Sequence, residues 1–343
     1  MESHNSSTSL NDSDDYYYGN ESGAVLIKLC EPKTYDELTG ICYITICCIS
    51  LIGNSLLLYG LARFEDLKRV TMLFILCLAV FDLLFTLTLP FWAVEHLHQW
   101  IFGDVACKIL IGAYFVGIYG SLILLTAMTI DRFFAIVIRS PWLTRRRRLY
   151  CARGACAGAW IISVGACLKD VLSSKGDEKD CTADFSKEDI FQYYTQLVLL
   201  FFFPLAIIIF CYGKILHTLM SITSKKKYRT VLVVLCIVVA FMVCWGPYHI
   251  LMILSAAYKP KECWKKNQLG KAFTACRILA YFHCCVNPLL YMLRGRSKKI
   301  LSSLVFCSPE LKQGLHQERH TEPSHSNIVQ QNSVVERVEL KSV

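Results

Sequence analysis

The sequence is poor in charged residues. Asp, Glu, Lys and Arg make up 18% of its 343 residues, against about a quarter in a typical soluble domain. It also lacks the CxxC spacing and the His/Cys clusters that are typical of metal sites. Residues 1–24 lack the basic start and apolar core of a cleavable signal peptide. We therefore expect neither a soluble protein nor a metalloprotein, and we expect the first transmembrane helix to act as the signal.

Apolar residues, in contrast, make up 54% of the chain, and the mean hydropathy is +0.41. They gather in seven runs, at 39–62, 71–95, 108–130, 153–172, 190–213, 230–257 and 272–293. Each run is long enough to cross about 30 Å of hydrocarbon. Such runs must be helical, because lipid offers no partner to unpaired backbone groups. The sequence therefore predicts an all-α membrane protein, a seven-transmembrane helix bundle over residues 39–293.

The remaining segments flank this bundle. Residues 1–38 form an acidic tail, and we expect a short amphipathic helix on the membrane surface over 294–307. Residues 308–343 are polar and are expected to be disordered.

Lys and Arg set the orientation of the bundle. They gather in alternate connections, at 63–69, 139–148, 225–229 and 294–299. Cytoplasmic loops carry such an excess, so the N-terminus is expected outside the cell. The sixth connection, 259–266, is also basic and departs from this pattern, but the other four sites agree with one another.

The external segments carry two kinds of modification signal. Three Asn-x-Ser sequons predict glycosylation of the tail, at Asn5, Asn11 and Asn20. Of 18 cysteines, four lie outside the bilayer on the external side: Cys30, Cys107, Cys181 and Cys263. The oxidising environment there favours disulfides. The residues alone leave three pairings open.

Polar and proline motifs stand inside the apolar runs, and their order resembles that of the rhodopsin-like (class A) G-protein-coupled receptors. In chain order they are Gly53-Asn54, Leu78-Ala79-Val80-Phe81-Asp82, Cys107, Asp131-Arg132-Phe133, Trp160, Pro204, Tyr212, Cys244-Trp245-Gly246-Pro247 and Asn287-Pro288-Leu289-Leu290-Tyr291. A carboxylate at membrane depth is costly unless it is paired or hydrated. The resemblance implies that Asp82 lies in a hydrated sodium pocket with Asn54, Ser121, Trp245 and Asn287. A purely structural polar contact is the alternative.

The resemblance also implies a switch at the cytoplasmic end. Asp131 and Arg132 would form a local latch, and Arg132 would contact the G protein beside Tyr212 and Tyr291. Phe133 stands where the family usually has tyrosine. Pro247 and Pro288 each remove a backbone donor, and we expect them to kink their helices. A kinked helix with two packing arrangements can act as a switch, although prolines also occur in membrane helices for packing alone.

Several ligand classes are disfavoured by what the sequence lacks. By motif spacing, Tyr281 stands where an opsin has its retinal-binding lysine, and Tyr114 stands where an amine receptor has its carboxylate. The acidic tail instead contains Asp14-Asp15-Tyr16-Tyr17-Tyr18, a sequence that invites tyrosine sulfation. Such a segment can attract a basic protein. The alternative is a solvated, disordered tail.

The remaining motifs resemble the chemokine receptors. Thr88-Leu89-Pro90 looks like the Thr-x-Pro helix distortion of that family, and His283 fits its seventh helix. The resemblance implies two disulfides, Cys30 with Cys263 and Cys107 with Cys181. Residues 276–291, with Arg277 where most chemokine receptors have glutamate, look like the XC (lymphotactin) type. A CC-type receptor is the near alternative.

Ligand binding in this family implies two steps. The tail, with Tyr16, Tyr17 and Tyr18, would hold the folded body of a basic chemokine, and the flexible N-terminus of the chemokine would enter the bundle. By family position the pocket is lined by Tyr43, Trp92, Tyr114, Tyr248, His249 and Arg277. Arg277 would meet an acidic or polar group of the ligand, or an internal partner such as Glu95. Core packing is the alternative role for the aromatic residues.

The resemblance further implies a plasma-membrane receptor, not an enzyme, that acts through an inhibitory (Gi) heterotrimeric G protein. Arrestin would bind the phosphorylated tail, Cys307 would be palmitoylated, and membrane lipids would contact the basic loops. Apart from a sodium ion at Asp82 we expect no cofactor, and we expect no nucleic-acid partner. A scavenging receptor without G-protein signalling is an alternative that only Phe133 favours. A seven-helix enzyme or transporter has no supporting motif.

Overall fold

The computed structural model describes residues 16–18, 27–29, 36–66, 68–139, 144–177, 180–183, 197–220, 225–257 and 262–291. The chain divides into two units, Met1–Gly295 and Arg296–Val343, and all the described residues belong to the first. The expected surface helix and tail, Cys307, Cys30 and the three sequons lie outside the described residues.

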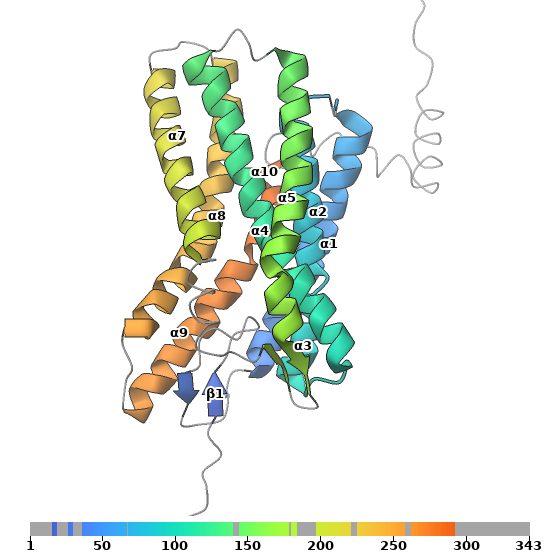
Figure 1. Cartoon of the computed structure of the whole chain (residues 1–343), viewed down its shortest axis with the longest axis vertical. Helices are drawn as coiled ribbons and strands as arrows, with labels where there is room; N and C mark the ends of the chain where they lie inside the picture. The colour runs from blue at the N-terminus through green and yellow to red at the C-terminus, as the bar shows by residue number, and fades with distance from the viewer. Residues whose placement is uncertain are drawn as a thin grey trace, which may run out of the picture. The chain divides into compact units, whose positions relative to one another are not determined.

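The described part is built almost entirely of helices (Figure 1). They are α1 Asp36–Phe64, α2 Val70–Thr86, α3 Leu89–Leu97, α4 Gly103–Phe133 with the π-helix η1 Phe134–Ile138, α5 Arg145–Ser173, the π-helix η2 Val198–Phe202 with α7 Phe203–Met220, α8 Lys225–Ala257, α9 Cys263–Tyr281 and α10 His283–Tyr291. These helices fall in the order of the predicted apolar runs. Among the described residues, five helical segments are long and apolar enough to cross a membrane.

Several helices begin earlier than the apolar runs predicted. The apolar runs begin near 39, 153 and 272, whereas α1 begins at Asp36, α5 at Arg145 and α9 at Cys263. The helices extend beyond the apolar runs because a helix can continue past the hydrocarbon into water, where charged side chains are no longer costly. Thr144 supplies a start signal for α5, since its hydroxyl accepts from the backbone N–H of Arg147 at 3.4 Å.

The predicted distortion in the second apolar run is confirmed. Helix α2 ends at Thr86, and α3 begins at Leu89, directly before Pro90. The hydroxyl of Thr88 donates to the carbonyl of Phe85 at 2.7 Å and thereby satisfies one carbonyl at the break.

The other prolines behave differently. Pro247 lies inside the unbroken helix α8, and Pro288 lies inside α10. The interruption in the last run falls at Phe282, between α9 and α10, and not at Pro288. The kinks at these two prolines stay predictions. Pro204 follows the π-helix η2, where a bond of i to i+5 type joins the N–H of Phe203 to the carbonyl of Val198.

Helix α4 runs through the bundle and contacts α2, α5, α7 and α8 (Figure 1). Two glycines allow the close approach of α2. A Cβ atom on Gly117 would lie 2.7 Å from the Cβ of Phe85, and one on Gly120 would overlap the ring of Phe81. Small residues of this kind let membrane helices pack backbone to backbone.

Two short hairpins accompany the helices. β3 Ser174–Gly176 pairs antiparallel with β4 Cys181–Ala183, and Cys181 forms a disulfide with Cys107 at the start of α4, as predicted. β1 Tyr16–Tyr18 pairs antiparallel with β2 Ile27–Leu29. The tyrosine segment of the tail therefore forms a β-strand. Cys263 is also disulfide-bonded; its pairing with Cys30 stays a prediction.

Candidate functional site

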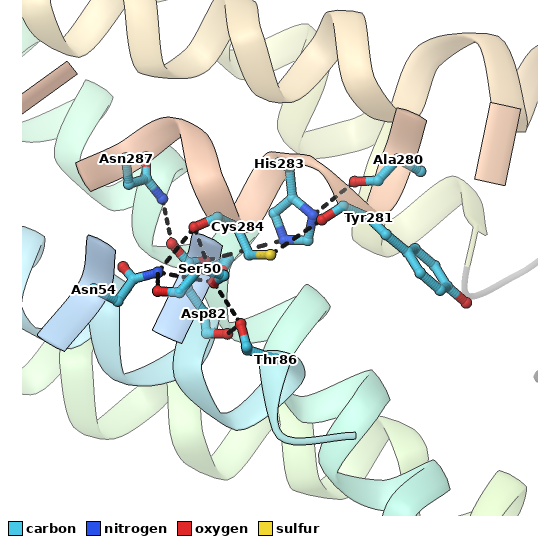
Figure 2. Close-up of polar contacts among 10 residues, drawn as sticks. Ser50, Asn54, Asp82, Thr86, Ala280, Tyr281, His283, Cys284 and Asn287 are labelled. Carbon is cyan, nitrogen blue, oxygen red and sulfur yellow. Dashed lines mark hydrogen bonds and ion pairs between the residues drawn. The ribbon is translucent and has the colours of Figure 1, made fainter. Parts of the chain in front are cut away.

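Asp82 lies at the centre of a polar network that joins four helices, and its side chain is fully buried (0% exposed). Asn287 on α10 donates to its Oδ2 at 2.5 Å, and Ser121 on α4 donates to its Oδ1 at 3.2 Å. Figure 2 shows Asp82 facing Asn287. Each of these partners was predicted, and the structure brings them together.

Asn54 belongs to the same network, one step away from the carboxylate (Figure 2). Its Nδ2 donates to the carbonyl of Cys284 at 2.9 Å and to Ser50 Oγ at 3.0 Å. Ser50 Oγ lies 2.6 Å from the hydroxyl of Thr86, which donates to the backbone carbonyl of Asp82 at 2.6 Å.

The hydrogen bond from Asn54 to the carbonyl of Cys284 follows from the missing N–H of a proline. Pro288 has no N–H, so the carbonyl four residues earlier, that of Cys284, loses its helical donor. Asn54 on α1 supplies the replacement donor at 2.9 Å, and Ser50 Oγ lies 3.4 Å from the same carbonyl. Gly53 allows this approach, since a Cβ there would lie 2.8 Å from the Cγ of Pro288. The Gly-Asn and Asn-Pro motifs, far apart in sequence, thus form one contact between α1 and α10.

His283 links the carboxylate to the aromatic core. Its Nδ1 lies 2.7 Å from the carbonyl of Ala280, which can only accept, so Nδ1 is the donor. The other nitrogen, Nε2, lies 4.0 Å from Asp82 Oδ1. The rings of Trp245 and His283 are 5.4 Å apart. Trp245 therefore reaches the Asp82 network through His283.

A second polar chain lies toward the external end of the bundle. Arg277 on α9 is buried (3% exposed), and its Nη2 lies 3.3 Å from Nε2 of His96 on α3. Nδ1 of the same imidazole lies 3.2 Å from Asp36 Oδ1 at the start of α1. Glu95, which was predicted as a partner of Arg277, accepts from the backbone N–H of Cys181 at 2.9 Å. The structure therefore places His96 beside Arg277, and Glu95 holds the β4 strand; a pairing of Glu95 with Arg277 stays a prediction.

Four residues of the predicted aromatic lining fall into two clusters. In the first, Tyr281 lies between Tyr43 (5.0 Å between ring centroids) and Tyr114 (5.8 Å), and its hydroxyl donates to that of Tyr114 at 3.3 Å. In the second, His249 lies 4.0 Å from Phe201 and 5.7 Å from Tyr248.

Trp245 packs against both clusters: its ring centroid lies 6.1 Å from that of Tyr248 and 6.4 Å from that of Tyr281. Trp92 packs on Trp100, with centroids 5.7 Å apart. Tyr43 and Trp92 are fully buried. These burials agree with core packing as well as with a role beneath the pocket.

At the cytoplasmic end, Asp131 has two arginine neighbours. Arg132 Nη2 lies 3.6 Å from its Oδ2, whereas Arg148 on α5 donates to both carboxylate oxygens, at 2.9 and 2.7 Å. Arg132 also donates to the hydroxyl of Thr71 on α2. Phe133 packs against Phe210 of α7, with centroids 6.0 Å apart. Tyr212 is buried on α7, and Tyr291 ends α10.

Some residues of these networks were missed by sequence reasoning. Ser50 and Thr86 stand four residues from Asn54 and Asp82, on the same helical faces, and this spacing could have indicated them. His96 carried no signal beyond its position beside Glu95. Arg148 was one of four consecutive arginines, and sequence cannot tell which of them turns inward.

Comparison with known proteins identifies the class. Residues 53–291 match the family of 7 transmembrane receptors (rhodopsin family), and the chain belongs to this family of multi-pass plasma-membrane receptors.

Within this class, its relatives are chemokine receptors. The human Chemokine XC receptor 1 is 36% identical over 78% of this chain and 83% of its own length. The C-X-C chemokine receptor type 2 of Canis lupus familiaris is 32% identical over 83% of this chain and 84% of its own length. The human C-C chemokine receptor type 6 is 31% identical over 86% of this chain and 85% of its own length. The chain is therefore a member of the chemokine receptor family.

Proposed function

We propose that this chain is an XC-type chemokine receptor that drives calcium flux and chemotaxis through an inhibitory G protein. The observation that carries the subtype is Arg277, a buried cation on α9 in a sequence context similar to that of XC receptors. The 36% identity to the human Chemokine XC receptor 1 supports the same subtype, although CXC and CC receptors follow at 32% and 31%.

The ligand pocket is proposed around Arg277. The Asp36, His96 and Arg277 chain orients the guanidinium from one side, through contacts of 3.2 and 3.3 Å. A guanidinium has five N–H donors and no acceptor, so it favours an acidic or polar group on the entering N-terminus of the chemokine. The tyrosine strand Tyr16–Tyr18, in the acidic tail, would bind the basic body of the same ligand.

A sodium ion is proposed at Asp82. Its carboxylate and the oxygen atoms of Ser121 and Asn287 are the hard ligands that such a cation prefers. Sodium would favour the inactive arrangement of the four helices, so sodium chloride should lower agonist affinity relative to potassium chloride by about fivefold or more. Asp82→Asn should remove this difference. Equal salt dependence in the wild type and Asp82→Asn would contradict a sodium role.

Signalling is proposed to follow from better binding of the chemokine to the active bundle than to the inactive one. Helix α8 would then move outward and open a cleft around Arg132, where the G protein binds. Phosphorylation of the tail would recruit arrestin.

A calcium-flux screen of transfected cells against a chemokine panel tests the subtype and the signalling together. We expect XC chemokines to give the response and pertussis toxin to abolish it. A response to CC chemokines alone would assign the chain to the CC type instead. A response that pertussis toxin does not affect would contradict Gi coupling.

A scavenging receptor is the second candidate, and Phe133 is the observation that favours it. In the structure Phe133 packs on Phe210, so its ring has an apolar role where a tyrosine would offer a hydroxyl. Ligand uptake without agonist-stimulated GTP exchange would support this candidate over the signalling receptor.

A further inference from the structure

A groove of about 260 Å³ opens beside Asp131, between α2, α4 and α5. Its wall includes Phe74 from α2, Ile130 from α4, Phe134 from η1, and Ala152 and Ala155 from α5. These side chains are all apolar. The two charged groups that reach the groove, Asp131 and Arg148, form the ion pair described above.

The size and the position of the groove restrict its ligand. Sites that enclose a drug-sized molecule usually measure about 300–1,000 Å³, so this groove can hold only part of a larger one. It lies between three membrane-spanning segments, and Phe134 and Cys151 in its wall are exposed. The groove lies beside the first turns of α5, next to the arginines that begin this helix, where the hydrocarbon meets the headgroups. A membrane lipid can place an acyl chain in such an apolar groove while its headgroup lies at the arginines.

Charge indicates which lipid. Arg148 uses Nε and Nη2 to hold Asp131, which accounts for two of the five N–H donors of a guanidinium. Its other donors can bind an anionic oxygen. Three more arginines, Arg145 to Arg147, stand in the same first turn of α5. Arg145 pairs with Asp66 at 3.4 Å, and the side chain of Arg146 is exposed. Anionic headgroups of the cytoplasmic leaflet are attracted to such basic segments.

We propose that this groove binds an anionic phospholipid of the inner leaflet. One acyl chain packs between Phe74, Phe134 and Ala155, and the phosphate accepts hydrogen bonds from Arg148. The rest of the lipid stays in the bilayer. This site is separate from the chemokine pocket and does not depend on the subtype of the receptor.

Photocrosslinking of the purified full-length receptor in nanodiscs tests the site. The probe is phosphatidylserine with a diazirine in one acyl chain, compared with phosphatidylcholine that carries the same chain. We expect phosphatidylserine to label peptides that contain residues 127–134 and 148–155, about fivefold more than phosphatidylcholine does. Equal labelling of these peptides by the two lipids would overturn the proposal.

Two matched pairs of variants locate the ligand. Ala155→Phe fills the groove, whereas Ala157→Phe adds the same ring at an exposed position of the same helix. Only Ala155→Phe should remove the labelling. Arg148→Gln should reduce labelling by phosphatidylserine to the phosphatidylcholine level, whereas Arg146→Gln removes the same charge from an exposed side chain outside the groove and should leave the preference intact.

Each variant is compared with the wild type at an equal amount of chemokine-binding receptor, so that misfolded receptor does not affect the labelling ratio. Arg148→Gln tests the site even where Ala155→Phe does not fold. Equal effects within either pair would overturn the proposal. Loss of the label on addition of cholesterol, without any preference between the two phospholipids, would assign the groove to a sterol instead.

Discussion

Arg148 holds both carboxylate oxygens of Asp131, at 2.9 and 2.7 Å, although the two residues belong to different helices. Arg132, the sequence neighbour of Asp131, lies 3.6 Å from the nearer oxygen. Asp131 is therefore shared between a distant arginine in bidentate geometry and an adjacent one at longer range. The pairing that the family resemblance implied exists here together with a stronger competitor.

This competition predicts the effect of Arg148→Gln. Without Arg148, the carboxylate of Asp131 is available to Arg132 alone, and the local latch tightens. A hydrogen bond to a charged group contributes about 1.5–3 kcal/mol, so we expect ligand-independent nucleotide exchange to fall by about tenfold. The measurement is GTP exchange on purified G protein with unliganded receptor. Arg146→Gln serves as the control, and an unchanged or raised basal rate in Arg148→Gln would refute the competition.

His96 is predicted to position Arg277 for the ligand. His96→Phe removes the nitrogen that lies 3.3 Å from Arg277 and the link to Asp36. We expect chemokine potency in a calcium-flux assay to fall by about tenfold. His98→Phe makes the same change at an exposed position two residues further along and should leave potency unchanged. A loss explained entirely by lower surface expression would show that His96 acts only in folding.

The contact between α1 and α10 makes a prediction about non-additivity. Asn54→Ala leaves the carbonyl of Cys284 short of a donor and should lower the stability of the detergent-solubilised receptor by about 1–3 kcal/mol. Pro288→Ala restores the backbone N–H that this carbonyl lacks. The cost of Asn54→Ala should therefore shrink in the Pro288→Ala background.

Thermal melting of the four proteins of this cycle gives the coupling. Ser55→Ala, at an exposed position of α1, is the control for the effect of a truncated side chain. Additive losses in the double variant would mean that Asn54 does not compensate for Pro288.

The approach of α2 to α4 is predicted to tolerate no side chain at Gly120. Gly120→Ala places a methyl group against the ring of Phe81, and overpacking of this kind costs about 1–3 kcal/mol. We expect lower surface expression and a lower melting temperature. Gly158→Ala, on α5 with open space around it, should retain both. Equal behaviour of the two variants would contradict the packing described here.

The helical structure of the apolar runs was predictable from the sequence, because a single apolar segment in lipid can satisfy its backbone hydrogen bonds only as a helix. The composition of the Asp82 network was predictable in part, since Asn287 and Ser121 came from motif positions. The route by which Asn54 joins the network was not. That route depends on a carbonyl that Pro288 deprives of its donor, and on the side chain of Asn54 on α1, which reaches the carbonyl of Cys284 on α10.

Charge pairs were the least predictable feature. Arg277 was recognised as a buried cation, but its neighbour His96 follows from the turn at residues 87–88, which sets the direction of α3. The inward position of Arg148 follows from the early start of α5 at Arg145. The apolar run begins only at 153, so hydropathy alone predicts a connection over 139–148 and gives no orientation for the arginines.

The central claim is that Arg277 meets the chemokine inside the bundle, and a dose–response measurement on Arg277→Glu tests it most directly. The receptor is expressed at equal surface level as wild type, as Arg277→Glu and as Lys266→Glu, a charge reversal on the same helix closer to its external end. We predict that XC chemokine loses at least about thirtyfold in calcium-flux potency on Arg277→Glu, because reversing a buried charge removes its partner interactions. Lys266→Glu should stay near wild type. Wild-type potency on Arg277→Glu would contradict the account.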